Sequence, residues 1–179
     1  MEWKHLVPIL VPVGLIGLGY ITRRGLGLGI RTLGTVTKHR GDKITFEIKV
    51  KNETDSSFSG GLGVAIRDSD GKIYYMSSDL SKFVPSTTPC EDTGIKSISL
   101  GANEEKTFSL SLTIPSDIAY GDIGLAVGVW EKADPCNPGK WLAFYPAEGP
   151  GNFASTDTVG NKVTIVPVYK LEITEVKVE

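Results

Sequence analysis

Side chains that could carry acid–base or nucleophilic chemistry are few and scattered in this chain. His5 and His39 are the only histidines, and neither has a serine or cysteine nucleophile in its sequence context. The paired carboxylates Glu104 and Glu105 fall in turn-like sequence without apolar surroundings that would raise a pKa. No G-x-S-x-G, Walker, H-E-x-x-H or C-x-x-C motif occurs. We therefore expect a protein that is not an enzyme and that carries neither a cofactor nor a metal.

Three short motifs suggest binding chemistry, and each also has a structural explanation. The "RGD" at 40–42 matches an integrin-binding tripeptide, but it also forms the turn before an expected strand. The "DSDG" at 68–71 resembles the start of a calcium loop, although the later acidic ligands are missing and a hairpin turn is favoured. Asn52 begins an N-glycosylation sequon that is usable only in a glycosylating compartment.

Cys90 and Cys136 are widely separated and match no metal-binding spacing. Each lies in loop-like sequence rich in Pro, Gly and polar residues, "STTPCEDTG" and "KADPCNPGK". A disulfide that ties one end of the fold together and two unconnected thiols are both compatible with this pattern. Exposed free thiols are chemically reactive, which favours the bridge.

Alternation of apolar and polar residues dominates the sequence from residue 35 onward. In "KITFEIKVKN", for example, Ile44, Phe46 and Ile48 alternate with polar residues, as in a strand with one buried face. We expect further strands in "GLGVAIRD", "KIYYMSS", "KTFSLSLTIP", "DIGLAVGVWE" and "KVTIVPVYKLEITEVKVE". No useful helical repeat follows residue 35. The pattern predicts an all-β fold over 35–179, an immunoglobulin-like antiparallel β-sandwich of about seven to eight strands.

Two of these stretches also carry a family resemblance. "HRGDKITFEIKVKN" followed by "GANEEKTFSLSLTIPSDIAYGDIGLAVGVWE" resembles the B, E and F strands of Ig-like and CARDB-like modules in microbial surface proteins and virion components. The resemblance covers residues 35–131 and implies the same β-sandwich fold. It transfers no functional residue. The Cys–Trp–Cys arrangement of antibody domains is missing, because neither cysteine lies in an expected strand.

Two segments are longer than ordinary hairpin loops, 78–96 and 132–161. Long loops in a compact domain often form functional or assembly surfaces. The second loop holds four aromatic residues of the kind found at interfaces. Contact with a partner and packing against the core are equally supported for them, since "KWLAFYP" also reads as a strand that caps the core. These candidate partner contacts are Trp141, Phe144, Tyr145 and Phe153.

The N-terminal part, residues 1–34, differs from this body. Residues 6–22 contain 17 residues without a charge. As a helix they would reach roughly 26 Å, close to the ~30 Å hydrocarbon core of a bilayer. We expect a helical membrane anchor or a strip buried in an assembly. Its apolar residues are Leu6, Ile9, Leu10, Val13, Leu15, Ile16, Leu18 and Ile21. The basic flank consists of Arg23, Arg24 and Arg31.

The glycine-rich stem at 23–34 is expected to be flexible or extended. Extended, it could add a strand to the sheet edge of a neighbouring subunit. A cleaved leader fits less well, because the first alanine of the chain is Ala65 and such leaders end in small residues.

The charge distribution bears on partners. Residues 1–40 carry a net charge of +5 and residues 41–179 a net charge of −7. An acidic body argues against nucleic-acid binding, whereas the basic stem suits lipid head groups or an acidic neighbour. Because most of the positive charge follows the apolar run, the positive-inside rule would leave the body on the cytoplasmic side. A virion with an internal membrane satisfies that orientation.

These observations lead to a functional expectation. We expect a non-enzymatic structural protein that is fixed through its N-terminus to a membrane or a multi-subunit particle, with a virion component favoured. Its partners would be membrane lipid or other subunits, in a homo-oligomer or a hetero-assembly, and its location the virion or the cell envelope. The alternatives are a subunit of an extracellular filament or cell-surface assembly, and a carbohydrate- or receptor-binding module that uses loop 132–161.

Overall fold

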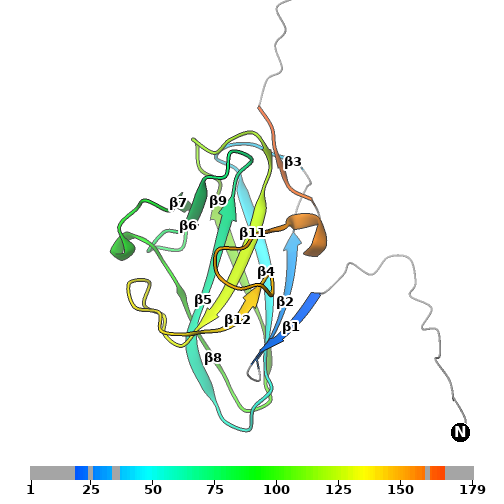
Figure 1. Ribbon diagram of the computed structural model, residues 1–179, viewed down its shortest axis with the longest axis vertical. Helices are drawn as coiled ribbons and strands as arrows, with labels where there is room; N and C mark the ends of the chain where they lie inside the picture. The colour runs from blue at the N-terminus through cyan, green and yellow to red at the C-terminus, as the bar shows by residue number, and fades with distance from the viewer. Residues whose placement is uncertain (1–18, 24–25, 34–36, 160–161, 168–179) are drawn as a thin grey trace, which may run out of the picture.

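The computed structural model describes residues 19–23, 26–33, 37–159 and 162–167, with side chains from 37 to 158 and from 162 to 167. Within these residues the protein is all-β, with two short 3-10 helices, η1 (Cys90–Asp92) and η2 (Thr156–Val159). Two antiparallel sheets face each other and enclose the core (Figure 1). The all-β sandwich expected from the alternating sequence is therefore present, although short additional strands raise their number above the expectation.

The first sheet has the strand order β1-β2-β4-β9. In β4 every second residue is buried from Ile44 to Val50, because that face packs against the opposite sheet. All neighbours in this sheet are antiparallel. Its strands are β1 (Gly19–Arg23), β2 (Leu26–Leu33), β4 (Lys43–Asn52) and β9 (Glu105–Thr113).

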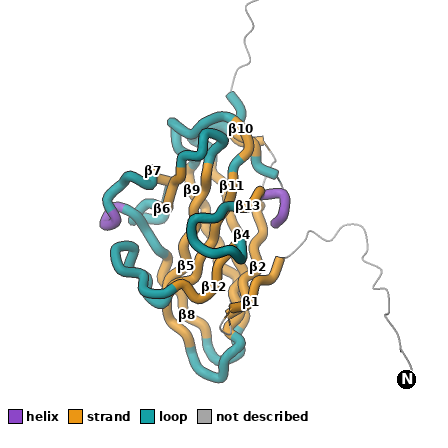
Figure 2. The backbone as a smooth tube through the Cα atoms, in the orientation of Figure 1, coloured by secondary structure: helices purple, strands orange, loops and turns teal. Residues whose placement is uncertain are grey.

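The second sheet has the order β12-β11-β5-β6-β7, with β8 also paired to β5 and β13 to β11. Figure 2 shows β5 and β11 running side by side through the middle of the molecule. The strands are β5 (Phe58–Arg67), β6 (Ile73–Met76), β7 (Phe83–Pro85), β8 (Lys96–Leu100), β11 (Gly124–Trp130), β12 (Trp141–Tyr145) and β13 (Ala154–Ser155).

Three two-residue strands close one end of the sandwich. They are β3 (Thr37–Lys38), β10 (Gly121–Asp122) and β14 (Thr164–Ile165), in the order β10-β14-β3. The expected C-terminal strand segment is therefore described only through β14. Residues 168–179 lie outside the described residues.

The two long loops contain more regular structure than their composition suggested. The segment 78–96 includes β7 and η1, and the segment 132–161 includes β12, β13 and η2. The sequence "KWLAFYP" thus forms an edge strand, β12, which pairs with β11.

The sandwich begins earlier than residue 35, so the boundary placed at 34/35 is corrected. β2 pairs with β4 over its whole length, from Leu26 opposite Asn52 to Leu33 opposite Thr45. The stem is extended, as one of the two expectations had it, but it joins the chain's own sheet rather than that of a neighbour. In this register Leu28 lies opposite Val50, which is buried.

The end of the apolar run is also strand rather than helix. Ile21 lies in β1, which pairs with β2 and lies beside β12 (Figure 1). Arg23 ends β1 and Arg31 lies within β2, so neither belongs to a free stem, whereas Arg24 lies outside the described residues. The remaining apolar positions, from Leu6 to Leu18, also lie outside the described residues. In the part of the chain that the structure describes, no helix has the length and apolar character needed to cross a bilayer.

Candidate functional site

The most distinctive surface of the second sheet is a strip of small residues on its outer face. Gly63 and Ala65 of β5 lie directly opposite Gly128 and Ala126 of β11. The alternating neighbours on β5, such as Val64, have their side chains in the core, so these four positions face away from it. The strip forms the floor of a cavity with a volume of about 390 Å³, which we call the β5–β11 groove.

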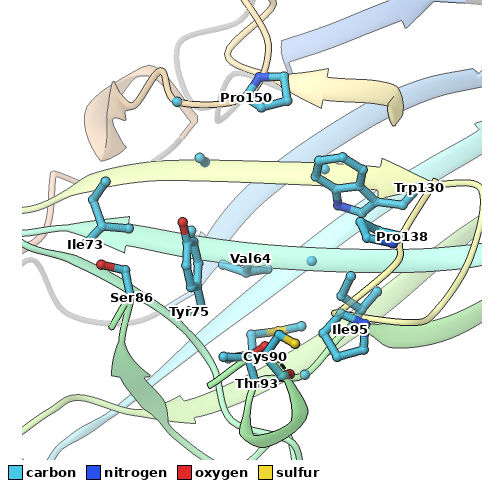
Figure 3. Close-up of a pocket in the computed structure, with 18 of the residues that line it drawn as sticks. Val64, Ile73, Tyr75, Ser86, Cys90, Thr93, Ile95, Trp130, Pro138 and Pro150 are labelled. Atoms are coloured by element: carbon cyan, nitrogen blue, oxygen red, sulfur yellow. Dashed lines mark hydrogen bonds between the residues drawn. The ribbon is translucent and has the colours of Figure 1, made fainter. Parts of the chain in front are cut away.

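Aromatic rings border this floor. Tyr75 of β6 lies opposite Ala65 in the sheet and is 41% exposed. Trp130, at the end of β11, is half-buried and forms an edge-to-face contact with Phe144 of β12 at 6.3 Å between ring centroids. Figure 3 shows Tyr75 and Trp130 standing along the central strands, well separated from each other. The groove therefore has a flat floor and large apolar walls.

Loops complete the walls, and a disulfide joins two of them. Cys90 of the loop between β7 and β8 is bonded to Cys136 of the loop between β11 and β12, with an S–S distance of 2.06 Å. The sequence was compatible with a disulfide or with two unconnected thiols, and the structure contains the disulfide. Pro138 lies near Trp130 at one end, while Pro150 lies across β11 from Cys90 (Figure 3).

The chemistry of the groove is uncharged. Its lining includes no Asp, Glu, Lys, Arg or His side chain among the described residues. The polar side chains are the hydroxyls of Tyr75, Ser86, Thr88 and Thr93 and the indole N–H of Trp130, and the Thr93 hydroxyl donates to the Cys90 carbonyl at 2.8 Å. Such a lining offers shape and apolar contact with a few hydrogen bonds.

A possible metal-binding group beside the groove has no free thiolate. The sulfur atoms of Cys90 and Cys136 lie close to a carboxylate oxygen of Glu91, and all three residues are exposed. Both sulfurs are consumed by the disulfide, and thiols must be deprotonated and free to bind a metal. The cluster therefore gives no support for a metal site.

The four rings of the second loop have separate roles. Phe144 and Phe153 line the groove, and Trp141 makes an edge contact with Phe144 at 6.3 Å. Tyr145 instead lies in the core, with 8% of its surface exposed and its hydroxyl bonded to Thr158. Burial raises the pKa of the Tyr145 phenol. Strand alternation therefore turns Tyr145 into the core, whereas Phe144, which is 6% exposed, lies on the other face of β12 and lines the groove.

Sequence reasoning missed Tyr75, Trp130 and the floor. A usable signal was present on the outward positions of two strands, since "GLGVAIRD" and "GLAVGVW" carry Gly or Ala where a solvent-facing strand carries polar residues. A glycine inside a strand often marks a close approach by other atoms. Gly128 is such a position, because an added Cβ would lie 2.9 Å from the Trp130 indole nitrogen.

Asn52 of the sequon is a structural residue. Its side-chain amide donates to the carbonyls of Ser56 at 2.7 Å and Gly101 at 2.8 Å, and its oxygen accepts from the Thr54 hydroxyl at 2.8 Å. Only 1% of Asn52 is exposed. A glycan cannot be attached to this amide without breaking the folded turn.

The other two motifs are turns, as expected. In "RGD", Arg40 donates to the Ile118 carbonyl at 2.8 Å and lies 4.0 Å from the centroid of the Tyr120 ring, while Asp42 accepts from the His39 N–H. In "DSDG", the buried Asp68 accepts from the backbone of Lys72 at 2.8 Å. The carboxylate of Asp68 is thus occupied by its own hairpin and by the backbone N–H of Ala119, at 3.0 Å.

Perturbed pKa values occur at surface carboxylates outside the groove. The ion pair with Lys72 lowers the pKa of Asp117, and the hydrogen bond from Lys162 lowers that of Asp122. Hydrogen bonds from Ser77 and Ser81 lower the pKa of Asp79 to about 2. These shifts follow from exposed structural contacts, so they do not indicate a catalytic centre.

No protein-family model matches this chain, and no curated protein resembles it in sequence. Solved structures do resemble its fold. The C-terminal domain of Wzt is 16% identical and aligns with a TM-score of 0.50 over 90% of this chain and 88% of that one. This similarity supports an Ig-like β-sandwich fold and nothing finer.

Two further similarities to solved structures are weaker. A β-glucosidase from Erythrobacter marinus is 17% identical over 79% of this chain, with a TM-score of 0.45, and this chain spans only 15% of that enzyme. A CARDB domain from Pyrococcus furiosus is 16% identical over 82% of this chain and 93% of the domain, with a TM-score of 0.38. At such scores neither bears on the fold or on activity.

Proposed function

We propose that this chain is a non-enzymatic structural subunit, a β-sandwich that joins a multi-subunit particle through its apolar N-terminal segment, residues 6–18. A virion is the particle we favour, in which the basic N-terminal part would lie against an acidic neighbouring subunit. The observation that carries the proposal is the attachment of this segment: residues 19–23 are already a strand of the sandwich, so the apolar segment leaves directly from a sheet edge.

Protein is a better partner for this segment than lipid. With Gly19–Arg23 in β1, the uncharged run that precedes the described strands is residues 6–18. Even a continuous helix of that length would span only about 20 Å, against roughly 30 Å for a hydrocarbon core. Such a segment is too short for an anchor and long enough to bury apolar side chains on a neighbouring subunit.

Deletion of residues 1–18 tests the proposal, because it leaves β1 and β2 intact. We expect the full chain to associate in sedimentation velocity runs without detergent. The truncated chain should sediment as a monomer with an unchanged far-UV circular dichroism spectrum. Flotation with lipid vesicles is the parallel measurement. Equal association of both chains, or a full chain that is monomeric in buffer and floats with vesicles, would contradict a protein-mediated assembly.

A carbohydrate-binding module is the second candidate, and the aromatic border of the groove favours it. Tyr75 and Trp130 present rings that could stack on the C–H face of a sugar. The hydroxyls of Ser86, Thr88 and Thr93 are few for a ligand rich in hydroxyl groups, which makes this candidate weaker. Titration of tryptophan fluorescence with soluble oligosaccharides tests it: saturable binding that is lost in Tyr75→Ala supports the module, and unchanged fluorescence rejects it.

A further inference from the structure

We infer that the β5–β11 groove receives the apolar segment, residues 6–18, of a second copy of this chain. This inference rests on the proposed function, since it names the surface that the segment binds. Each copy then carries one segment and one groove. The contact joins two different surfaces, so it repeats from copy to copy and generates a ring or an open filament.

The chemistry of the two surfaces matches. The groove lining carries no charged side chain, and the run from Leu6 to Thr22 carries none either. The segment also contains Pro8 and Pro12, which disfavour a soluble helix and favour an extended chain. Grooves bordered by aromatic rings are a recurring binding site for extended, proline-containing segments. An apolar lining with Tyr75 and Trp130 at its border is a site of this kind.

The dimensions match as well. Trp130 marks one end of the groove, and Phe153, whose Cβ lies 3.0 Å from the position of a Cβ added to Gly124, marks the other. Gly124 and Trp130 are the two ends of β11, six residues apart, which corresponds to roughly 20 Å of strand. An extended stretch of about six residues therefore fills the groove. The segment 6–18 is long enough to supply such a stretch and a connection to its own sandwich.

The position of the groove favours a second copy over the chain's own segment. β1 lies beside β12, on the same side of β11 as β13. That side of the groove is closed by a wall that includes Phe144, Pro150 and Phe153. The segment of the same chain would have to cross this wall to reach the floor, whereas the segment of a neighbour approaches from the open face.

Two complementary variants of the full chain test the inference. Ala65→Glu places a charge in the floor and leaves the N-terminal segment intact, and Leu10→Asp places a charge in the segment and leaves the groove intact. We expect each variant alone to be monomeric in sedimentation velocity runs. Their mixture should form a 1:1 complex, because one intact segment meets one intact groove.

A milder pair of variants keeps the test valid if Ala65→Glu fails to fold. Tyr75→Ala removes an exposed ring from the groove, and Tyr120→Ala removes an equally exposed ring elsewhere, at 41% and 47% exposure. We expect Tyr75→Ala to weaken self-association about tenfold, as for an interface hot spot. Tyr120→Ala should associate like the original chain.

The outcomes separate this inference from the proposed function. If deletion of residues 1–18 abolishes association but Ala65→Glu and Tyr75→Ala associate normally, the structural role stands and the groove is not the receptor. If the two charged variants fail to form a 1:1 complex, contact between copies through the groove is rejected. Saturable binding of a soluble oligosaccharide in the groove of the associated chain would also overturn it.

Discussion

Gly63 of β5 and Gly128 of β11 are paired in the sheet, but their surroundings differ. An added Cβ at Gly128 would lie 2.9 Å from the Trp130 indole nitrogen and 3.0 Å from two carbons of the Phe144 ring. At Gly63 the nearest contact would be 3.5 Å, an ordinary van der Waals distance. The Trp130 and Phe144 rings therefore pack closely against Gly128 but not against Gly63.

This difference predicts opposite results for two alanine substitutions. We expect Gly128→Ala to lower the free energy of unfolding by about 1–3 kcal/mol, because the rings must shift. Gly63→Ala is the matched control and should be neutral or slightly stabilising, since alanine reduces the entropy of the unfolded chain. Urea unfolding measures both. Equal effects of the two substitutions would show that the rings do not pack on Gly128 as described.

At the scale of elements, the turn between β6 and β7 depends on one carboxylate. Asp79 accepts hydrogen bonds from the Ser77 hydroxyl at 2.5 Å, and from the Ser81 hydroxyl at 2.7 Å and backbone N–H at 3.1 Å. These bonds favour the charged carboxylate, which is why its pKa falls to about 2 from the usual 3.8. This turn connects β7 to β6, with which it pairs, and β6 carries Tyr75.

The lowered pKa of Asp79 predicts how stability depends on pH. The folded state binds a proton at Asp79 less readily than the unfolded state, so the stabilisation is present above pH 4 and is lost as the pH falls towards 2. We expect Asp79→Asn to lose free energy of unfolding at pH 7 and to show a shallower decline between pH 4 and pH 2. Denaturant unfolding across this range is the measurement. If the free energy of unfolding of both proteins declined equally between pH 4 and pH 2, the Asp79 carboxylate would not stabilise this turn.

At the scale of the whole molecule, β2 belongs to the sandwich, and this separates two truncations. Deletion of residues 1–18 removes only residues outside β1. Deletion of residues 1–33 also removes β2 and leaves the backbone edge of β4 without its partner. An unpaired edge strand loses its hydrogen bonds and becomes a site of aggregation.

We therefore expect the longer deletion to lower the unfolding temperature by about 10 °C or more, at roughly 2–4 °C per kcal/mol for a chain of this size. The shorter deletion should leave the unfolding temperature nearly unchanged. Differential scanning calorimetry gives both values, and hydrogen exchange of the β4 amides shows whether the loss is local. A longer deletion that melts like the full chain would mean that β2 contributes nothing to the sandwich.

Local sequence by itself determined the strands with a clear period of two. In β4, Ile44, Phe46 and Ile48 alternate with polar residues, and each is buried as that pattern requires. The same alternation located the cores of β5, β9 and β11. Side-chain direction in a strand is a property of neighbouring residues, so a short stretch of sequence contains the information.

Only the tertiary structure decided which segments meet. β2 finds its partner in β4 of the same chain, Cys90 meets Cys136 across 46 residues, and Tyr75, Trp130 and Phe144 come from three strands to border one floor. Tyr145 and Phe144 are equally aromatic and adjacent, yet the direction of β12 sends one into the core and the other to the groove. Strand pairing and the side chains that border the groove depend on contacts between residues far apart in the chain. A local sequence pattern contains no information about those contacts.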